Sequence, residues 1–168
     1  MIYFITGGAR SGKSSYAQKE ALSLSDNPVY VATANVMDAE FEQRVTRHKA
    51  DRDERWTALE EPMHVSKLPI ADRVVVVDCV TLWLTNFFLK YEQDIHASLD
   101  ALKKEIDELD NHPGTFFIVS NEIGMGLHAD TEMGRKFVDL QGWANQYIAA
   151  KAKKAVFMVA GIPVFVKS

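Results

Sequence analysis

The sequence has little of what would mark a secreted, membrane-bound or nucleic-acid-binding protein. It contains one cysteine, Cys79, so no disulfide can form within the chain, and we expect a cytoplasmic protein. Its formal net charge is −4, so the sequence lacks the excess of basic residues that is typical of proteins that bind nucleic acids or membrane surfaces. The apolar run at residues 155–166 is about half as long as a membrane span requires and is interrupted by Gly161-Ile162-Pro163. We therefore expect no membrane span and no nucleic-acid partner.

What the sequence does contain is a series of short apolar runs that alternate with longer amphipathic stretches. Its 168 residues predict one domain, residues 1–168. The apolar runs are continuous, as in strands covered on both faces, and they lie at residues 2–6, 29–32, 74–78, 115–120 and 155–160. This pattern predicts an α/β fold in which a mainly parallel sheet is flanked by helices, expected at residues 13–24, 38–51, 81–90, 94–109 and 131–153. Residues 163–167 follow a Gly-Ile-Pro turn and are expected to form a C-terminal antiparallel edge strand.

A glycine-rich segment follows the first predicted strand and precedes the first predicted helix. It reads Gly7-Gly8-Ala9-Arg10-Ser11-Gly12-Lys13-Ser14 and fits the pattern G-x-x-x-x-G-K-[ST] of a phosphate-binding P-loop. Glycines let successive backbone N–H groups turn toward phosphate oxygens, and the helix N-terminus adds positive potential. Lys13 is expected to reach the β and γ phosphates, and the Ser14 hydroxyl to bind Mg²⁺. All of Gly7, Gly8, Ala9, Arg10, Ser11, Gly12, Lys13 and Ser14 are predicted nucleotide contacts.

Asp78 ends a run of four valines and is the predicted second ligand of Mg²⁺. A carboxylate at the end of a buried strand beside a P-loop can hold the ion directly or through water. On its own, such an aspartate is more often a strand-end or helix-cap residue, and it is the P-loop that favours the metal role. The sequence has no guanine-reading N-K-x-D motif, which disfavours a signalling GTPase switch.

A histidine stands between two arginines in the segment after the second predicted strand. His48 shares a helical face with Phe41 and Val45, and Arg44 and Arg52 lie four residues to either side of it. Spacing alone leaves two interpretations open. His48 can pack against or cap the helix, as lone histidines commonly do. Alternatively, it can be a nucleophile, with the arginines stabilising a pentavalent phosphorus during transfer.

Five segments spread over nearly the whole chain form a more specific pattern. They are the P-loop, Tyr30-Val31-Ala32-Thr33-Ala34 with the downstream Arg44-Val45 and residues 48–52, Asp78-Cys79-Val80-Thr81-Leu82-Trp83-Leu84-Thr85-Asn86, Asn121-Glu122-Ile123-Gly124-Met125-Gly126, and Ala160-Gly161-Ile162-Pro163. In this order they resemble the bifunctional adenosylcobinamide kinase / adenosylcobinamide-phosphate guanylyltransferase family of cobalamin biosynthesis. The P-loop alone is generic, whereas the five segments together are specific. The resemblance implies a RecA-like P-loop fold.

The resemblance also implies two successive reactions and a homotrimer. A nucleoside triphosphate, ATP or GTP, phosphorylates the aminopropanol hydroxyl of adenosylcobinamide. GMP is then taken from GTP onto a histidine and passed to the new phosphate, giving adenosylcobinamide-GDP. The position that matches the guanylylated histidine is His48, which is therefore the predicted catalytic residue. Besides the P-loop, the positions that match nucleotide contacts of the family are Ala32, Thr33, Ala34, Lys49, Ala50, Asp51, Arg52, Glu60 and Asp78.

Two other functions are compatible with a P-loop in this chain. One is a monofunctional P-loop small-molecule kinase in which His48 only binds phosphate. The other is a non-catalytic nucleotide-binding regulator, which the missing switch and guanine-reading motifs disfavour.

The motifs assign no single role to several other residues. Glu122 follows the fourth predicted strand, where ligands bind in open α/β sheets, and it can either polarise a substrate hydroxyl or cap a helix. Glu105 and Leu109 are expected on the solvated surface of the helix at residues 94–109. The remaining histidines lack partners at metal-ligand spacing and are expected on the surface; they are His64, His96, His112 and His128.

Overall fold

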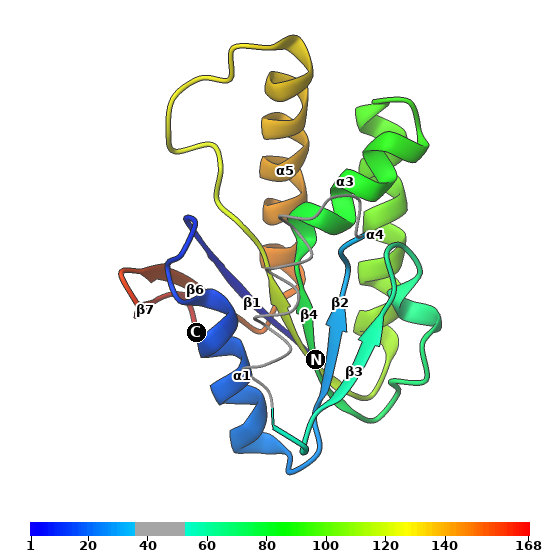
Figure 1. Ribbon diagram of the computed structural model, residues 1–168, viewed down its shortest axis with the longest axis vertical. Coiled ribbons are helices and arrows are strands. Elements are labelled where there is room, and N and C mark those ends of the chain that lie inside the picture. The colour runs from blue at the N-terminus through cyan, green and yellow to red at the C-terminus, as the bar shows by residue number, and fades with distance from the viewer. Residues whose placement is uncertain (36–52) are drawn as a thin grey trace.

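A computed structural model describes residues 1–35 and 53–168 and shows one mainly parallel sheet with helices on both faces (Figure 1). The strands are β1 (Ile2–Gly7), β2 (Val29–Ala32), β3 (Thr57–Glu60), β4 (Val74–Asp78), β5 (Thr115–Val119), β6 (Lys154–Val159) and β7 (Ile162–Lys167). The described helices are α1 (Lys13–Leu24), α3 (Val80–Lys90), α4 (Ile95–Asn111) and α5 (Glu132–Lys151), with a short 3-10 helix η1 (Val65–Lys67).

The order of the strands is β3-β2-β4-β5-β1-β6-β7. Every neighbouring pair is parallel except β6 and β7, which are antiparallel. Strand β5 lies between β1, which leads into the P-loop, and β4, which ends at Asp78, and this separation is the arrangement of RecA-like P-loop folds. The predicted fold class is therefore confirmed, including the antiparallel strand at the C-terminal edge.

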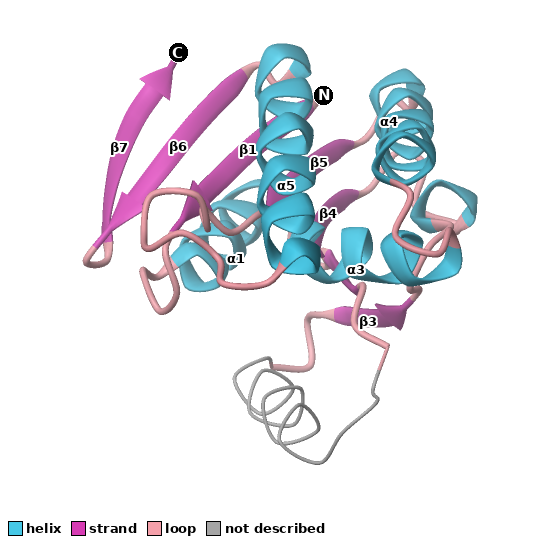
Figure 2. Ribbon diagram, turned by 90° about the horizontal axis from the view of Figure 1, so that it is seen from above, coloured by secondary structure: helices cyan, strands magenta, loops and turns pink. Residues whose placement is uncertain are grey.

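The two faces of the sheet are covered by different helices, as Figure 2 shows from above. Side chains alternate along β1, so Ile2 and Phe4 join the core under α3, α4 and α5, whereas Ile5 packs with Ala17 of α1 on the opposite face. The larger cluster contains the fully buried Trp83. Continuous apolar runs in the central strands follow from this double coverage.

Local sequence sets where the later helices begin. The Asp94 carboxylate accepts a hydrogen bond from the Ala97 backbone N–H at 2.9 Å and caps α4. The Thr131 hydroxyl accepts one from the Gly134 N–H at 3.0 Å and caps α5. Both helices begin within one residue of the predicted positions, because their capping residues can be recognised in the sequence. Among the described residues, no helix has the length and apolarity to cross a bilayer.

Strand β3 was not predicted. Its four residues are mostly exposed and form no apolar run, so neither of the usual strand patterns is present. The strand forms because its backbone pairs with β2, with Val29 opposite Thr57 and Ala32 opposite Glu60, at the edge of the sheet. The predicted helix at residues 38–51 lies outside the described residues.

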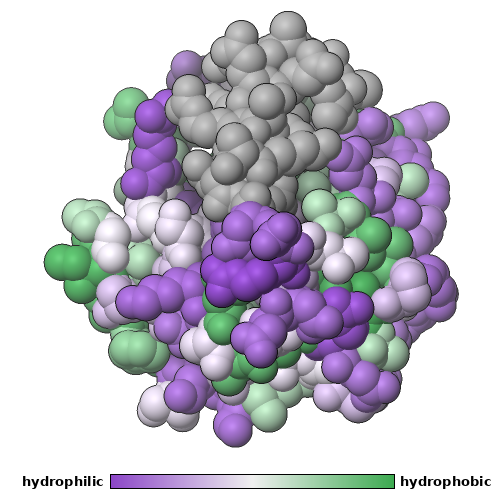
Figure 3. Space-filling view, turned by 60° about the horizontal axis from the view of Figure 1, so that its bottom comes forward, coloured by the Kyte–Doolittle hydropathy of each residue, from purple (hydrophilic) through white to green (hydrophobic). Residues whose placement is uncertain are grey.

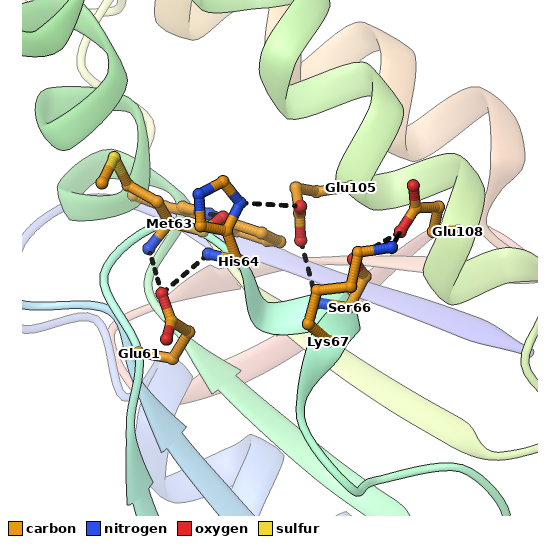
Figure 4. Close-up of polar contacts among 8 residues, drawn as sticks. Glu61, Met63, His64, Ser66, Lys67, Glu105 and Glu108 are labelled. Carbon is orange, nitrogen blue, oxygen red and sulfur yellow. Dashed lines mark hydrogen bonds and ion pairs between the residues drawn. The ribbon is translucent and has the colours of Figure 1, made fainter.

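The connection after β3 is held against α4 by Glu105, contrary to the expectation that this residue lies on a solvated surface (Figure 4). Its side chain is 7% exposed, and Oε2 accepts a hydrogen bond from the Ser66 backbone N–H at 2.8 Å. Oε1 lies 3.5 Å from Nδ1 of His64, so His64 has a partner that sequence spacing did not reveal. The expectation for Leu109 is also wrong, because this residue is fully buried in the core.

Two further contacts fix the same connection. Glu61 accepts hydrogen bonds from the backbone N–H groups of Met63 and His64 at 2.9 and 2.8 Å (Figure 4). The indole Nε1 of the buried Trp83 donates to the Met63 carbonyl oxygen at 2.8 Å. The segment that leaves β3, and with it Glu60 at the end of that strand, is thus attached to α3 and α4.

We predict that Glu105→Ala lowers the free energy of unfolding by about 1–3 kcal/mol, because the Ser66 N–H is left without its buried acceptor. Glu105→Gln keeps an acceptor oxygen and should lose less. Glu108→Ala is the matched control. Glu108 lies three residues after Glu105 on the same helix, contacts Lys67 and the Ser66 hydroxyl, and is more exposed. Urea denaturation measures all three, and equal losses for Glu105→Ala and Glu108→Ala would contradict the burial argument.

Candidate functional site

The P-loop runs from the end of β1 to the start of α1 at the carboxyl edge of the sheet (Figure 1). Gly7 has φ +150°, and a Cβ there would lie 2.5 Å from the Met158 carbonyl oxygen, so this position requires glycine. Gly12, which caps α1, has φ +92°, and a Cβ would lie 3.2 Å from Cα of Gly161. The Gly161 N–H donates to the Ser11 carbonyl oxygen at 3.0 Å. The turn between β6 and β7 therefore packs directly against the P-loop.

Lys13 begins α1, and its side chain folds back over the loop. It is 7% exposed, and Nζ donates to the Gly8 carbonyl oxygen and, at 3.4 Å, to the Ser11 hydroxyl. Burial lowers the pKa of Lys13, while the nearby Cys79 and Asp78 oppose that shift. The ammonium group thus lies within electrostatic reach of the end of β4, with Ser14 next to it in the first turn of α1.

Three predicted nucleotide contacts are aligned across three neighbouring strands. The register of the sheet places Ala32 of β2 opposite both Glu60 of β3 and Asp78 of β4. Residues paired in this way share a face, and the hydroxyl of Tyr30, two residues before Ala32, donates to Asp78 Oδ2 at 2.7 Å. Because Tyr30 packs in the cluster under α1, this row lies on the P-loop helix's side of the sheet.

Thr33 follows this row and is fully buried, with both hydrogen-bonding functions of its hydroxyl in use. Oγ1 donates to the Cys79 carbonyl oxygen at 2.7 Å and accepts from the Cys79 N–H at 2.9 Å. The Thr33 N–H donates to the Asp78 carbonyl oxygen at 3.1 Å. In this structure Thr33 therefore holds the Asp78-Cys79 turn in place and does not present its side chain at the surface, whereas the neighbouring Ala34 is half-buried.

The loop after β5 joins the P-loop from the other side. The Glu122 N–H donates to the Gly7 carbonyl oxygen at 2.9 Å, and the Asn121 side chain donates to the Thr81 hydroxyl at 3.0 Å. Of the two roles left open for Glu122, neither is seen directly: its Oε1 accepts from the Gly124 N–H at 2.7 Å and closes its own loop.

A layer of buried polar side chains supports this loop, and the sequence analysis missed it. Ser120 Oγ donates to Asn145 Oδ1 at 2.6 Å, and Gln141 Nε2 donates to both of these atoms. Asn145 Nδ2 in turn donates to the Asn121 carbonyl oxygen at 3.1 Å. Gln141 and Asn145 lie four residues apart on α5, and this polar pair on the buried face of an amphipathic helix was the available signal.

Ser14 and Asp78 are the described residues that suit Mg²⁺. The ion prefers oxygen ligands and in phosphate sites is bound by one or two protein groups together with substrate phosphates. A hydroxyl in the first turn of α1 and a carboxylate at the end of β4 fit this donor set, and no larger cluster of His, Cys, Asp or Glu occurs in the described part of the chain. The remaining predicted site residues lie outside the described residues; they are His48, Lys49, Ala50, Asp51 and Arg52.

A P-loop between a buried strand and a helix, with a carboxylate at the end of a nearby strand, defines a protein of the P-loop fold. The family described as cobinamide kinase / cobinamide phosphate guanyltransferase matches residues 3–166. The chain belongs to this family, which confirms the resemblance seen in the sequence.

Individual relatives extend the match to the full length. The chain is 39% identical to the bifunctional adenosylcobalamin biosynthesis protein CobP of Pseudomonas aeruginosa, over 97% of this chain and 95% of that protein. It is 35% identical to CobU of Escherichia coli and 34% identical to CobU of Salmonella typhimurium, each over 99% of this chain and 100% of the relative. Among solved structures, the flagellar accessory protein FlaH of Methanocaldococcus jannaschii matches 99% of this chain and 77% of that chain at a TM-score of 0.49 and 11% identity, too distant a likeness to bear on function.

We predict that Gly7→Ala destabilises the fold by about 2 kcal/mol or more, because the new Cβ meets backbone atoms that cannot move independently. Gly8→Ala is the matched control, since a Cβ at Gly8 meets nothing within 4 Å. Thermal denaturation compares the two variants. A Gly7→Ala protein as stable as Gly8→Ala would show that the close approach to Met158 is not a constraint.

Cys79 offers a test of how tightly the end of β4 is enclosed. Burial, and to a lesser degree the negative charge of Asp78, raises the pKa of the Cys79 thiol to about 12. We predict that iodoacetamide at a pH of about 9, just above the ordinary thiol pKa, alkylates the unfolded chain and spares the folded one. Above a pH of about 9, the Cys79 thiol loses its proton in the unfolded chain and keeps it in the folded chain. The free energy of unfolding therefore falls as pH rises toward 12. Equal alkylation rates with and without denaturant would contradict this enclosure.

Proposed function

We propose that this chain catalyses both reactions joined in its family: phosphorylation of adenosylcobinamide, and transfer of GMP from GTP to the phosphorylated product. The observation that carries the proposal is that the P-loop, with Lys13 and Ser14, and Asp78 lie at the same carboxyl edge of a parallel sheet, in a chain that matches the family from residue 3 to residue 166. We further propose that the protein acts in the cytoplasm, where ATP and GTP are available.

In the kinase step, the P-loop N–H groups bind the triphosphate, and Lys13 exchanges its contact with the Gly8 carbonyl oxygen for the β and γ phosphates. Ser14 and Asp78 hold Mg²⁺, which neutralises phosphate charge when bound. The substrate hydroxyl oxygen forms a bond to the γ-phosphorus and loses its proton to solvent, while the bond to the bridging oxygen breaks and the nucleoside diphosphate leaves. Tyr30 orients the Asp78 carboxylate through its hydrogen bond at 2.7 Å.

In the guanylyltransferase step, an imidazole nitrogen of His48 attacks the α-phosphorus of GTP and pyrophosphate leaves. A phosphate oxygen of the phosphorylated cobinamide then attacks the same phosphorus, and the histidine is released. We assign nucleotide contacts to Ala32, Ala34, Glu60 and the segment from Lys49 to Arg52, and a positioning role to Thr33, whose side chain is fully engaged with Cys79. Two in-line transfers need cations near the phosphates, which this basic segment supplies.

The edge of the sheet supports an assembled state, for which we propose the homotrimer implied by the family resemblance. Much of the molecular face shown in Figure 3 is hydrophilic, and apolar groups appear both toward its right side and at its left margin, the side where Figure 1 places β7. Strand β7 exposes Ile162, Val164, Phe165 and Val166. An exposed apolar edge strand is a surface that soluble proteins commonly cover by association.

We predict that wild-type protein incubated with Mg²⁺ and α-labelled GTP acquires an acid-labile, base-stable label, and that His48→Ala abolishes it while retaining phosphorylation of cobinamide. A phosphoramidate has this acid lability, and the kinase step does not use the imidazole. Labelling is measured after denaturing gel filtration, and kinase activity from γ-labelled triphosphate. Normal labelling of His48→Ala would refute the assignment, and an unlabelled but kinase-active wild type would favour the monofunctional kinase.

Lys13→Ala serves as the complementary variant in that experiment. Losing a charge-assisted contact to the phosphates should weaken triphosphate binding about 10- to 100-fold and so reduce both activities. The contrast between a variant that loses one activity and a variant that loses both separates the nucleophile from the phosphate site.

A further inference from the structure

The loop between β5 and α5 exposes large apolar side chains beside the P-loop. Leu127 is 98% exposed and Met125 is 77% exposed, and Met133 in the first turn of α5 is 49% exposed. Exposed loops are usually polar, and apolar side chains gathered within nine residues of sequence point to a binding surface.

Both ends of this loop are anchored by hydrogen bonds. At its base, the Glu122 N–H is bonded to the Gly7 carbonyl oxygen, and the Asn121 side chain is bonded to Thr81 at the start of α3. The buried amide of Asn145 holds the Asn121 carbonyl oxygen from below. At its far end, Thr131 caps α5. Both ends of the loop are therefore fixed to the rest of the protein, and Figures 1 and 2 show the loop leaving the same edge of the sheet as the P-loop.

The position of the loop in the sheet order decides what it faces. Strand β5 lies between β1 and β4, so the loop leaves the sheet between the P-loop and Asp78. The γ-phosphate must lie in this interval if Lys13 and Asp78 act on it together. Another exposed apolar group, at the turn between β6 and β7, lies on the opposite side of β1 from Asp78.

We propose that the loop of residues 121–131, with the first turn of α5, is the docking surface for the corrin macrocycle of cobinamide. This inference rests on the proposed function. The reacting hydroxyl sits on a short arm of the macrocycle and must reach the γ-phosphate, so the ring has to lie on a surface continuous with the interval between the P-loop and Asp78. The ring carries methyl groups at its rim, which flexible methionine and leucine side chains accommodate, and amide arms, which the backbone of Gly124 and Gly126 can meet.

The test compares the double variant Met125→Ser/Leu127→Ser with Leu24→Ser. Leu24 is also an exposed leucine, 56% exposed, but it ends α1 at the far end of that helix from the P-loop. Equilibrium dialysis with cobinamide, read from the visible absorbance of the corrin ring, gives the affinity directly. Calorimetry with GTP, sedimentation and a denaturation curve report the nucleotide site, the subunit number and the fold.

The double variant should bind cobinamide about tenfold or more weakly and show a matching rise in KM, with GTP affinity unchanged, while Leu24→Ser behaves like wild type. Unchanged cobinamide affinity overturns the proposal. So does a parallel loss of GTP affinity, or a loss of cobinamide binding that tracks a change in subunit number, because the loop would then serve the nucleotide site or a subunit contact. If wild type binds cobinamide without phosphorylating it, the docking surface stands and the proposed function falls. If wild type does not bind cobinamide, both fall.

Discussion

The close approach of three segments at Gly7 is the constraint on which the carboxyl edge of the sheet depends. A Cβ at Gly7 would lie only 2.5 Å from the Met158 carbonyl oxygen. Because glycine has no Cβ, the P-loop can pass this close to the end of β6. From the other side, the Glu122 N–H is bonded to the Gly7 carbonyl oxygen. One residue without a Cβ thus joins the P-loop to the end of β6 and to the loop after β5. A bulkier residue would separate the elements whose proximity gives this edge its chemistry.

The polar side chains on the two faces of the sheet have different surroundings. On the face of α1, the polar groups at the edge of a small apolar cluster are Lys13 in the first turn of α1, Tyr30 of β2 and Asp78 at the end of β4. On the other face, α3, α4 and α5 cover the larger core, and buried polar side chains fix the connections that leave it. The buried side chains of Glu105, Ser120 and Asn145 on this second face are hydrogen-bonded to neighbouring segments, which suits holding a loop in place more than binding a changing set of ligands.

Much of the fold could be predicted because its signals are local. A P-loop is a contiguous pattern, the central strands are continuous apolar runs, and Asp94 and Thr131 are visible helix caps. Strand β3 could not be predicted, because an exposed edge strand is defined by backbone pairing with β2. Glu105 was misplaced because an amphipathic pattern assigns every glutamate to solvent, whereas here a backbone N–H from a distant segment compensates its burial. The part of the predicted site from His48 to Arg52 lies outside the described residues, so its arrangement stays a prediction.

Membership of the family and the geometry of the P-loop edge together support one protein that performs a phosphoryl transfer and then a guanylyl transfer. The most direct measurement of that claim is product analysis by mass spectrometry after wild-type protein is incubated with cobinamide, Mg²⁺, ATP and GTP. Cobinamide phosphate should appear first and cobinamide-GDP should follow at its expense, with GTP required for the second product. Accumulation of cobinamide phosphate without any cobinamide-GDP, or unchanged cobinamide, would contradict it.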